Sequence, residues 1–290
     1  MPAFRTILVP VGDSGTALGV LDAALGLGRR FGSHVTALHV RTDPALAVPL
    51  IGEGLSAAMV DEMISLAETQ AAKRAETARA AFEEARLRFD APLATAPDTE
   101  GLSAEWVDVT GREEDEVVRR GRLSDLIVCG HPEGDEEIPA MTTLNAALLT
   151  AGRPLLLCPG RPPAPFGRKV AIAWNGSTEA SSAVAWAMPF LREAESVTLL
   201  TVTEHANGPI AAPAGDLAAY LAWNGIASTT VATQAPPSQA GAELLRQAVA
   251  CGADLLVMGA YTHSRLRQLI LGGVTRRIIA NAPIHCLMCH

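Results

Sequence analysis

The feature that most constrains this chain of 290 residues is an internal duplication. Segments of similar pattern recur in the same order: 6–14 and 169–177 at an offset of 163 residues, 35–40 and 197–202 at 162, and 125–130 and 254–259 at 129. The pairs Arg153–Pro154 and Ala282–Pro283 keep the last of these offsets. Ordered self-similarity is the signature of a repeated structural unit. The chain is therefore predicted to consist of two tandem copies of one domain.

The offset falls by 33 residues between the second and third matches, so the first copy carries an extra segment. Residues 55–89 are the candidate, because this stretch lacks Pro and Gly and is rich in Ala, Glu, Arg and Lys. Its larger apolar side chains fall at helical spacing and predict a long amphipathic helix: Met59, Met63, Leu66 and Phe82. The second copy has only a stretch broken by Gly and Pro, residues 206–225, in that place.

A proline-rich segment separates the copies. Residues 159–167 hold four prolines in nine positions, which neither a helix nor a central strand tolerates, so we expect a stiff linker. The predicted organisation is a first domain over 1–158, the linker over 159–167, and a second domain over 168–290.

Short β-branched runs alternate with helical patterns in each copy. This alternation predicts an α/β fold of two tandem doubly wound, Rossmann-like parallel sheets with right-handed crossovers. Ligands of such sheets bind beyond the carboxyl ends of the strands. In the second copy we expect strands at 170–174, 197–202, 227–232, 254–259 and 284–288, and helices at 178–191, 238–251 and 274–281.

Charge and composition exclude several classes of function. The formal charge of −8 disfavours nucleic acid as a partner, because like charges repel at long range. The sequence contains no uncharged apolar stretch of the roughly 18 residues that a membrane span needs. Neither a signal peptide nor a disulfide framework is indicated: the five cysteines are odd in number and lie in apolar contexts. We expect a cytoplasmic protein with reduced thiols.

The segment after the fourth strand of the second copy can hold an anion. Gly259 ends the strand, and Gly272 and Gly273 immediately precede a helical pattern. Amides at a helix N-terminus attract anions through free donors and the helix dipole together. Hydroxyl and basic side chains surround these glycines in the sequence: Thr262, Ser264, Arg265, Arg267 and Thr275.

The segment that contains these residues resembles the nucleotide-binding motif of the universal stress protein family, and the whole chain resembles the tandem two-domain members of that family. In nucleotide-binding members the fourth strand leads into Gly-x-x-Gly, nine residues, then Gly and Ser or Thr. Here the spacing is kept, but Thr262 replaces the second glycine and Gly273 replaces the hydroxyl residue. The run 265–276 also resembles tandem members. The resemblance implies ATP or AMP as ligand, with Mg²⁺, and two copies packed about a pseudo-two-fold axis.

The resemblance further implies roles for individual residues of the second copy. Asn175 stands where the family has an acidic residue that contacts the nucleotide, and the backbone near Val202 would meet the adenine edge. Glycines and the start of the last helix would surround the ribose and phosphates. The full candidate set is Asn175, Val202, Gly259, Thr262, His263, Ser264, Arg265, Gly272, Gly273, Val274 and Thr275.

Two other clusters are set aside. The first copy places Glu133, Asp135, Glu136 and Glu137 where phosphates would lie, so nucleotide binding is not expected there. The C-terminal run His285–His290 looks like a metal box. Its alternate residues point to opposite faces of a strand, so core thiols are the better interpretation and no metal site is predicted.

The leading hypothesis is an adenine-nucleotide-binding stress-response protein with a sensing or protective role. No nucleophile, base and orienting group can be assembled, so a committed enzyme is not predicted. Two alternatives stay open: an interaction protein of the same fold that presents the long helix to a protein partner, and a weak nucleotide hydrolase using His263 as acid or base. A further homodimer is compatible with either reading.

Overall fold

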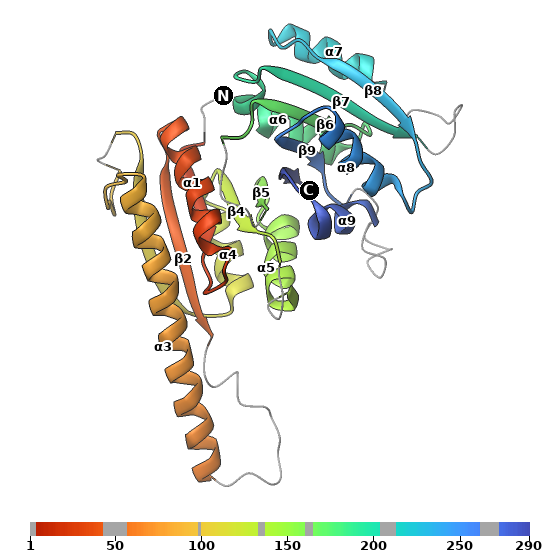
Figure 1. The fold of residues 1–290 in the computed structure, drawn as a ribbon. Helices are drawn as coiled ribbons and strands as arrows, with labels where there is room; N and C mark the ends of the chain where they lie inside the picture. Colours follow the sequence, from red (N-terminus) through yellow and green to blue (C-terminus); the bar gives the residue numbers. More distant parts are fainter. Residues whose placement is uncertain are drawn as a thin grey trace.

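The computed structural model describes residues 4–42, 57–97, 100–132, 137–159, 165–203, 213–261 and 273–290. Strands and helices alternate along these residues (Figure 1). In the first copy they are β1 (Thr6–Pro10), α1 (Ala17–Phe31), β2 (His34–Thr42), α3 (Ala57–Arg88), β3 (Ser103–Gly111), α4 (Glu113–Gly121), β4 (Leu126–Gly130), α5 (Glu137–Thr150) and β5 (Leu155–Cys158). In the second copy they are β6 (Lys169–Ala173), α6 (Thr178–Leu191), β7 (Ser196–Thr203), α7 (Ala214–Trp223), β8 (Thr229–Gln234), α8 (Ala240–Ala250), β9 (Leu255–Gly259), α9 (Gly273–Asn281) and β10 (His285–Cys289).

The strands form one sheet of ten, in the order β3-β2-β1-β4-β5-β10-β9-β6-β7-β8. Each half has the order third, second, first, fourth, fifth, and its strands pair in parallel. This is the doubly wound topology, and it occurs twice. The predicted fold class is confirmed.

The two halves meet through their last strands. β5 and β10 pair antiparallel, with Leu155, Leu156 and Leu157 opposite Met288, Leu287 and Cys286. Side chains on both strands are buried, so the junction lies in the middle of the core and not at a surface. The final strands of the two copies therefore form their junction.

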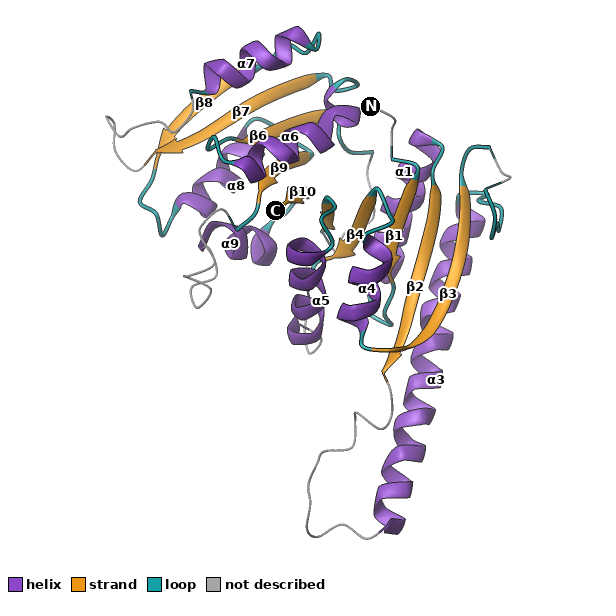
Figure 2. Cartoon of the chain, turned by 180° about the vertical axis from the view of Figure 1, so that it is seen from behind, coloured by secondary structure: helices purple, strands orange, loops and turns teal. Residues whose placement is uncertain are grey.

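Helices cover both faces of the sheet, and each face has a hydrophobic core that runs through both copies (Figure 2). One core lies beneath α1, α3, α6 and α7. The other lies beneath α4, α5, α8 and α9. Burial of apolar side chains on both faces is what a largely parallel sheet requires.

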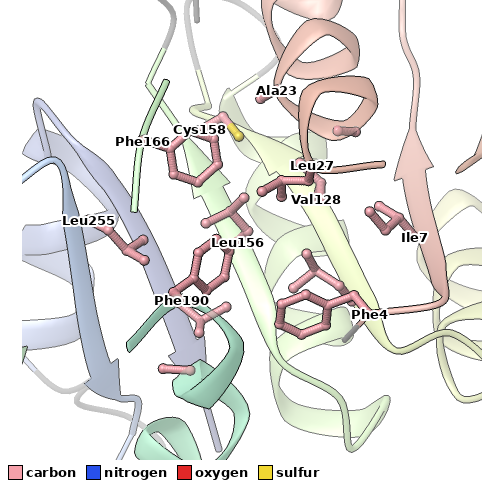
Figure 3. Close-up of a cluster of buried hydrophobic side chains, with 14 of the residues drawn as sticks. Phe4, Ile7, Ala23, Leu27, Val128, Leu156, Cys158, Phe166, Phe190 and Leu255 are labelled. Carbon is pink, nitrogen blue, oxygen red and sulfur yellow. The ribbon is translucent and has the colours of Figure 1, made fainter. Parts of the chain in front are cut away.

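A cluster of aromatic side chains packs at the junction, on the face of the sheet that α1, α3, α6 and α7 cover (Figure 3). Four of the six phenylalanines of the chain meet there, with ring centroids 5.5 to 6.1 Å apart: Phe4, Phe31, Phe166 and Phe190. The Arg30 guanidinium lies 5.4 Å from the centre of the Phe190 ring and bonds to Glu193 at 2.7 Å. Most of the phenylalanines of this chain thus lie where the copies join.

Helix α7 corrects one expectation. The stretch 206–225 reads as broken by Gly and Pro, yet residues 214–223 form a helix. Pro213 stands at its N-cap, where a proline is tolerated, and Gly215 lies in its first turn. Leu217 and Leu221 are buried, so tertiary packing stabilises the helix despite the glycine. Helix α6, in contrast, has the predicted bounds.

Helix α3 confirms the predicted long helix in the inserted segment. Only the C-terminal part of its apolar face, however, is buried. Phe82 is fully buried against the sheet. Met59, Met63 and Leu66 are 50%, 40% and 59% exposed. Figure 1 shows why, because the N-terminal part of α3 extends beyond the end of the sheet. No helix among the described residues combines the length and apolar character needed to cross a membrane.

The junction contains a titratable group whose burial makes stability depend on pH. The His285 ring stacks on Phe166 with centroids 3.7 Å apart. Burial lowers the pKa of His285 from 6.5 to about 4, partly offset by a hydrogen bond to the Asp254 backbone. The unfolded chain therefore binds a proton at a higher pH than the folded chain does.

We predict that this histidine destabilises the fold as pH falls from 6.5 towards 4. Its share of the loss is about 3 kcal/mol, since each unit of pKa corresponds to roughly 1.4 kcal/mol. Urea unfolding across this pH range should show a shallower decline for His285→Phe, which keeps a neutral ring against Phe166. Parallel curves for the two proteins would contradict the prediction.

Candidate functional site

The candidate site lies at the carboxyl edge of the second half of the sheet. There the strand order reverses between β6 and β9, which is where doubly wound sheets bind ligands. Asn175 follows β6, Val202 lies near the end of β7, and Gly259 is the last residue of β9. The topology thus brings three of the predicted residues to one edge of the sheet.

Asn175 has a local structural role. Its side-chain Oδ1 accepts the Ser177 backbone N–H at 3.1 Å, which forms an Asx-type turn. Ser177 Oγ in turn accepts the Ala180 N–H at 3.1 Å and caps α6. The Nδ2 group is the part of the Asn175 side chain that can donate to a ligand.

Gly259 lies where the backbones of β9 and α6 approach each other. A Cβ at this position would be 2.5 Å from the Ala180 nitrogen and 2.8 Å from the Glu179 carbonyl carbon. Because both neighbours are backbone atoms, no side-chain rotation can relieve the overlap. Glycine is required here to bring the end of β9 against the first turn of α6.

Helix α9 begins at the same edge. Gly273 is its first residue and is exposed, and a Cβ added there would have no atom of the described residues within 4 Å. The first amides of a helix have no acceptor within the helix. Thr275 is buried, and its Oγ1 accepts the Tyr261 backbone N–H at 3.2 Å. Its hydroxyl therefore ties the end of β9 to the first turn of α9.

Tyr261 is a residue that the sequence reasoning missed. Its backbone has a φ of 55°, a left-handed conformation that is uncommon for a bulky side chain. Its hydroxyl donates to Asn145 Oδ1 of α5 at 2.6 Å, so the first copy anchors the segment that leaves β9. The one available signal is Asn145 itself, an amide within the apolar run Leu144–Leu149.

The first copy differs at the equivalent position. At the repeat offset of 129, Gly273 corresponds to Leu144, which is buried within α5. Helix α5 starts at Glu137, so the amides near Leu144 lie inside a helix and not at its end. Towards the carboxyl ends of the strands in the first half, His39 is buried, and its Nδ1 lies 2.8 Å from the Val11 carbonyl oxygen. The two copies share a topology but not a helix N-terminus at this place.

Several predicted residues lie outside the described part of the chain. These are Thr262, His263, Ser264, Arg265 and Gly272, together with residues 133–136 of the acidic segment in the first copy.

Of the C-terminal histidines and cysteines, His285, Cys286 and Cys289 are buried in the core, whereas His290 is exposed. Burial raises the pKa of the Cys286 and Cys289 thiols to about 12, so both are protonated at neutral pH. His290 Nδ1 lies 3.0 Å from the Ala260 carbonyl oxygen. Within the described residues, no group of three or more His, Cys, Asp or Glu side chains is arranged to hold a metal ion.

The sequence profile of the universal stress protein family matches residues 3–151 and 167–290, which is most of the chain. This chain belongs to the universal stress protein family. A search of curated proteins finds no matching relative.

Solved structures share the fold over the full length of this universal stress protein. One is a universal stress protein from Archaeoglobus fulgidus, with a TM-score of 0.64 and 15% identity over 98% of this chain and 96% of that one. Another is a putative universal stress protein from Pseudomonas aeruginosa, with a TM-score of 0.57 and 17% identity over 99% and 94%. The tandem arrangement thus recurs in proteins with little sequence in common.

Replacing Gly259 by alanine should destabilise the fold by about 1–3 kcal/mol, the usual cost of overpacking against atoms that cannot move. Gly215→Ala is the matched control, because a Cβ at Gly215 meets nothing within 4 Å and lies in helix α7. That control should be neutral or stabilising. Urea unfolding measures both, and equal stability of the two variants would contradict the close approach at Gly259.

Removing the Tyr261 hydroxyl should cost about 1 kcal/mol of stability, the net value of one hydrogen bond. A double-mutant cycle of Tyr261→Phe and Asn145→Ala isolates the coupling between the two copies. The exposed Tyr220 provides the control through Tyr220→Phe, which should leave stability unchanged. Additive effects of the two mutations would show that the contact carries no energy.

Proposed function

We propose that this protein is an adenine-nucleotide-binding stress-response protein with a regulatory or protective role, and that the second copy holds the nucleotide. Membership of the family does not by itself specify the ligand, the binding site or the half of the chain that holds it.

The observation that carries the proposal is the asymmetry between α9 and α5. Helix α9 presents its N-terminus at the carboxyl edge of the sheet, beside open space at Gly273, whereas α5 runs through the equivalent position. A helix N-terminus next to a strand end is the arrangement that holds phosphate groups in doubly wound sheets. Only the second of the two equivalent positions has it.

The other described residues fit the remaining parts of a nucleotide. Val202 lies near the end of β7 and Trp174 directly follows β6, so both lie at the carboxyl ends of neighbouring strands. The Asn175 amide can donate a hydrogen bond but brings no charge. Among the solved family members, one universal stress protein is in complex with cAMP.

The binding role does not require catalysis. The described residues at this edge supply backbone N–H donors, the Asn175 side-chain amide and the Thr275 hydroxyl, which already accepts a hydrogen bond from Tyr261. Such groups can bind and orient phosphates, but they do not activate a nucleophile. Any hydrolysis of ATP would be slow and incidental.

A second candidate function is a protein-interaction module of the same fold. Met59, Met63 and Leu66 favour it, because they form an exposed apolar stripe on the part of α3 that extends past the sheet. Exposed apolar residues at helical spacing are typical of helices that dock onto partners.

Calorimetry with ATP, ADP and AMP, each with Mg²⁺, tests the proposed function. We expect saturable binding to the wild-type chain and at least tenfold weaker binding to Gly273→Asp. An aspartate at a helix N-terminus favours the helix by about 0.3–1 kcal/mol, so this variant should fold while its charge repels phosphate. Gly273→Asn is the neutral control of the same size and should bind within a few-fold of wild type.

Absence of heat and of any thermal shift with all three nucleotides at about 5 mM would overturn the proposal, since such affinities fall below about 3–4 kcal/mol of binding energy. That outcome would favour the interaction module. Equal loss of binding in Gly273→Asp and Gly273→Asn would indicate a steric effect and would contradict the proposed electrostatic role of the helix end.

A further inference from the structure

The sheet ends in two outer strands, β3 and β8, and β3 is protected against pairing with another chain. It carries the charged residues Glu105 and Asp108. Part of its outer edge is also covered, because the Ala94 N–H donates to the Ala104 carbonyl at 3.0 Å and the Ala104 N–H donates to the Pro92 carbonyl at 2.9 Å. Charges and covering segments are the usual means by which natural proteins protect the edges of a sheet.

Among the described residues, nothing protects strand β8 at the other end of the sheet in this way. Its sequence, TTVATQ, contains no charged residue and no proline, and four of its six residues are exposed. Within the part of the chain that the structure describes, β8 pairs with β7 and with no other strand. An uncharged edge rich in β-branched residues is a template on which another strand can pair.

The hydrogen bonds between β8 and β7 identify the backbone groups that face outward. The Ala235 N–H donates to the Thr203 carbonyl at 3.1 Å, and Thr203 Oγ1 donates to the Thr233 carbonyl at 3.4 Å. Residues 233 and 235 therefore direct their backbone groups towards β7. Because successive residues of a strand direct these groups to alternate edges, the N–H and C=O groups of residues 230, 232 and 234 point outward.

Helix α7 lies beside this edge in both Figure 1 and Figure 2. Asp216 is its one charged residue, and Leu217 and Leu221 are buried. Its two large aromatic side chains are not buried: Tyr220 is 48% exposed and Trp223 is 92% exposed. A helix with so little polar surface is normally covered on all sides. An uncovered apolar surface thus lies next to the uncovered edge of β8.

A second copy of this chain fits this edge. Antiparallel pairing of two β8 strands about a two-fold axis at Ala232 places Ala232 opposite its own equivalent and Thr230 opposite the partner's Gln234. The outward N–H and C=O groups of one strand then meet those of the other. No like charges face each other across the seam, because β8 has none.

The chain already contains one junction of this kind. β5 and β10 pair antiparallel, and the equivalent helices α1 and α6 of the two copies lie on the same face of the sheet. A seam between two β8 strands repeats this arrangement between two chains, so their α7 helices also lie on one face, beside the seam.

We propose that two copies of this chain form a dimer through β8, with the strands paired antiparallel around Ala232 and with Tyr220 and Trp223 of α7 covered at the seam. The dimer does not depend on the proposed nucleotide, because the groups that form it belong to β8 and α7.

The surface that this pairing covers sets the expected affinity. Tyrosine and tryptophan side chains bury about 150–250 Å² each, so the four of them in a dimer contribute at most about 600–1,000 Å². Together with the strands, the covered area lies near the lower end of the roughly 1,200–2,000 Å² of specific interfaces. We therefore expect a dimer with a Kd of about 1–100 μM.

Sedimentation velocity of the full chain over about 1–300 μM tests the proposal. Ala232→Lys places two ammonium groups opposite each other and should weaken the dimer at least tenfold. Ala232→Pro removes the central outward donor without removing a hydrogen bond to β7, and it should have the same effect. Ala80→Lys, at an exposed position on α3, is the matched control and should dimerise as the wild type does. Trp223→Ala should also weaken the dimer at least tenfold.

Hydrogen exchange of the wild type, resolved to single residues, locates the seam without any substitution. The outward N–H groups of Thr230, Ala232 and Gln234 should exchange at least tenfold more slowly at concentrations where the dimer predominates than in dilute protein. The N–H groups of Val231 and Thr233 face β7, so their exchange should depend little on concentration.

A chain that stays monomeric at about 300 μM would overturn the proposal. So would a dimer whose affinity is unchanged in Ala232→Lys, Ala232→Pro or Trp223→Ala, or one in which the exchange of the outward N–H groups does not depend on concentration. Loss of the dimer in Leu66→Lys but not in Ala232→Lys would place the interface on α3 and would equally overturn it.

Discussion

The antiparallel pairing of β5 with β10 is the interaction on which the rest of this structure depends. Each half alone would end in a strand of fully buried apolar residues with an unpaired edge, Leu155–Cys158 in one and His285–Cys289 in the other. Such edges invite association with other chains. Pairing them removes both edges and merges the cores of the two halves on each face of the sheet. The two copies therefore share one sheet and its cores, and Phe166, Phe190 and His285 lie where they join.

Much of this fold could be predicted from the sequence, because duplication and alternating periodicity are local signals. Helix α6 was expected at its observed bounds, and the strands of the second copy at theirs within about two residues. Helix α7 was not predicted, since Pro213 and Gly215 suggest a break and only burial of Leu217 and Leu221 shows otherwise. The exposure of Met59, Met63 and Leu66 could not be predicted either. Periodicity shows that a helix has an apolar face, but it does not show where the sheet beneath the helix ends.

The candidate site was predictable in place but not in detail. Glycine spacing locates Gly259 and Gly273 at the end of a strand and the start of a helix, and the structure puts them there. The contact between Tyr261 and Asn145 joins residues 116 positions apart, and no local pattern encodes it. The start of α5 was also hidden, because a helix can begin several residues before the equivalent glycine without changing the repeat offset. Whether an N-terminus faces the sheet edge is a property of the helix bounds, and spacing alone does not supply it.

The Tyr261–Asn145 contact and the early start of α5 make the two copies physically different. In a symmetric pair each copy would present the same groups to the other, and each would hold the same ligand. Here α5 has no helix end at the position equivalent to Gly273, but it supplies Asn145 to the segment that leads away from β9 in the other copy. Helix α5 thus lacks the helix end that α9 has, and it contacts the second copy instead. Because the hydrogen bond from Tyr261 to Asn145 joins the two copies, the segment that leaves β9 is held by the first copy as well as by Thr275 of its own copy.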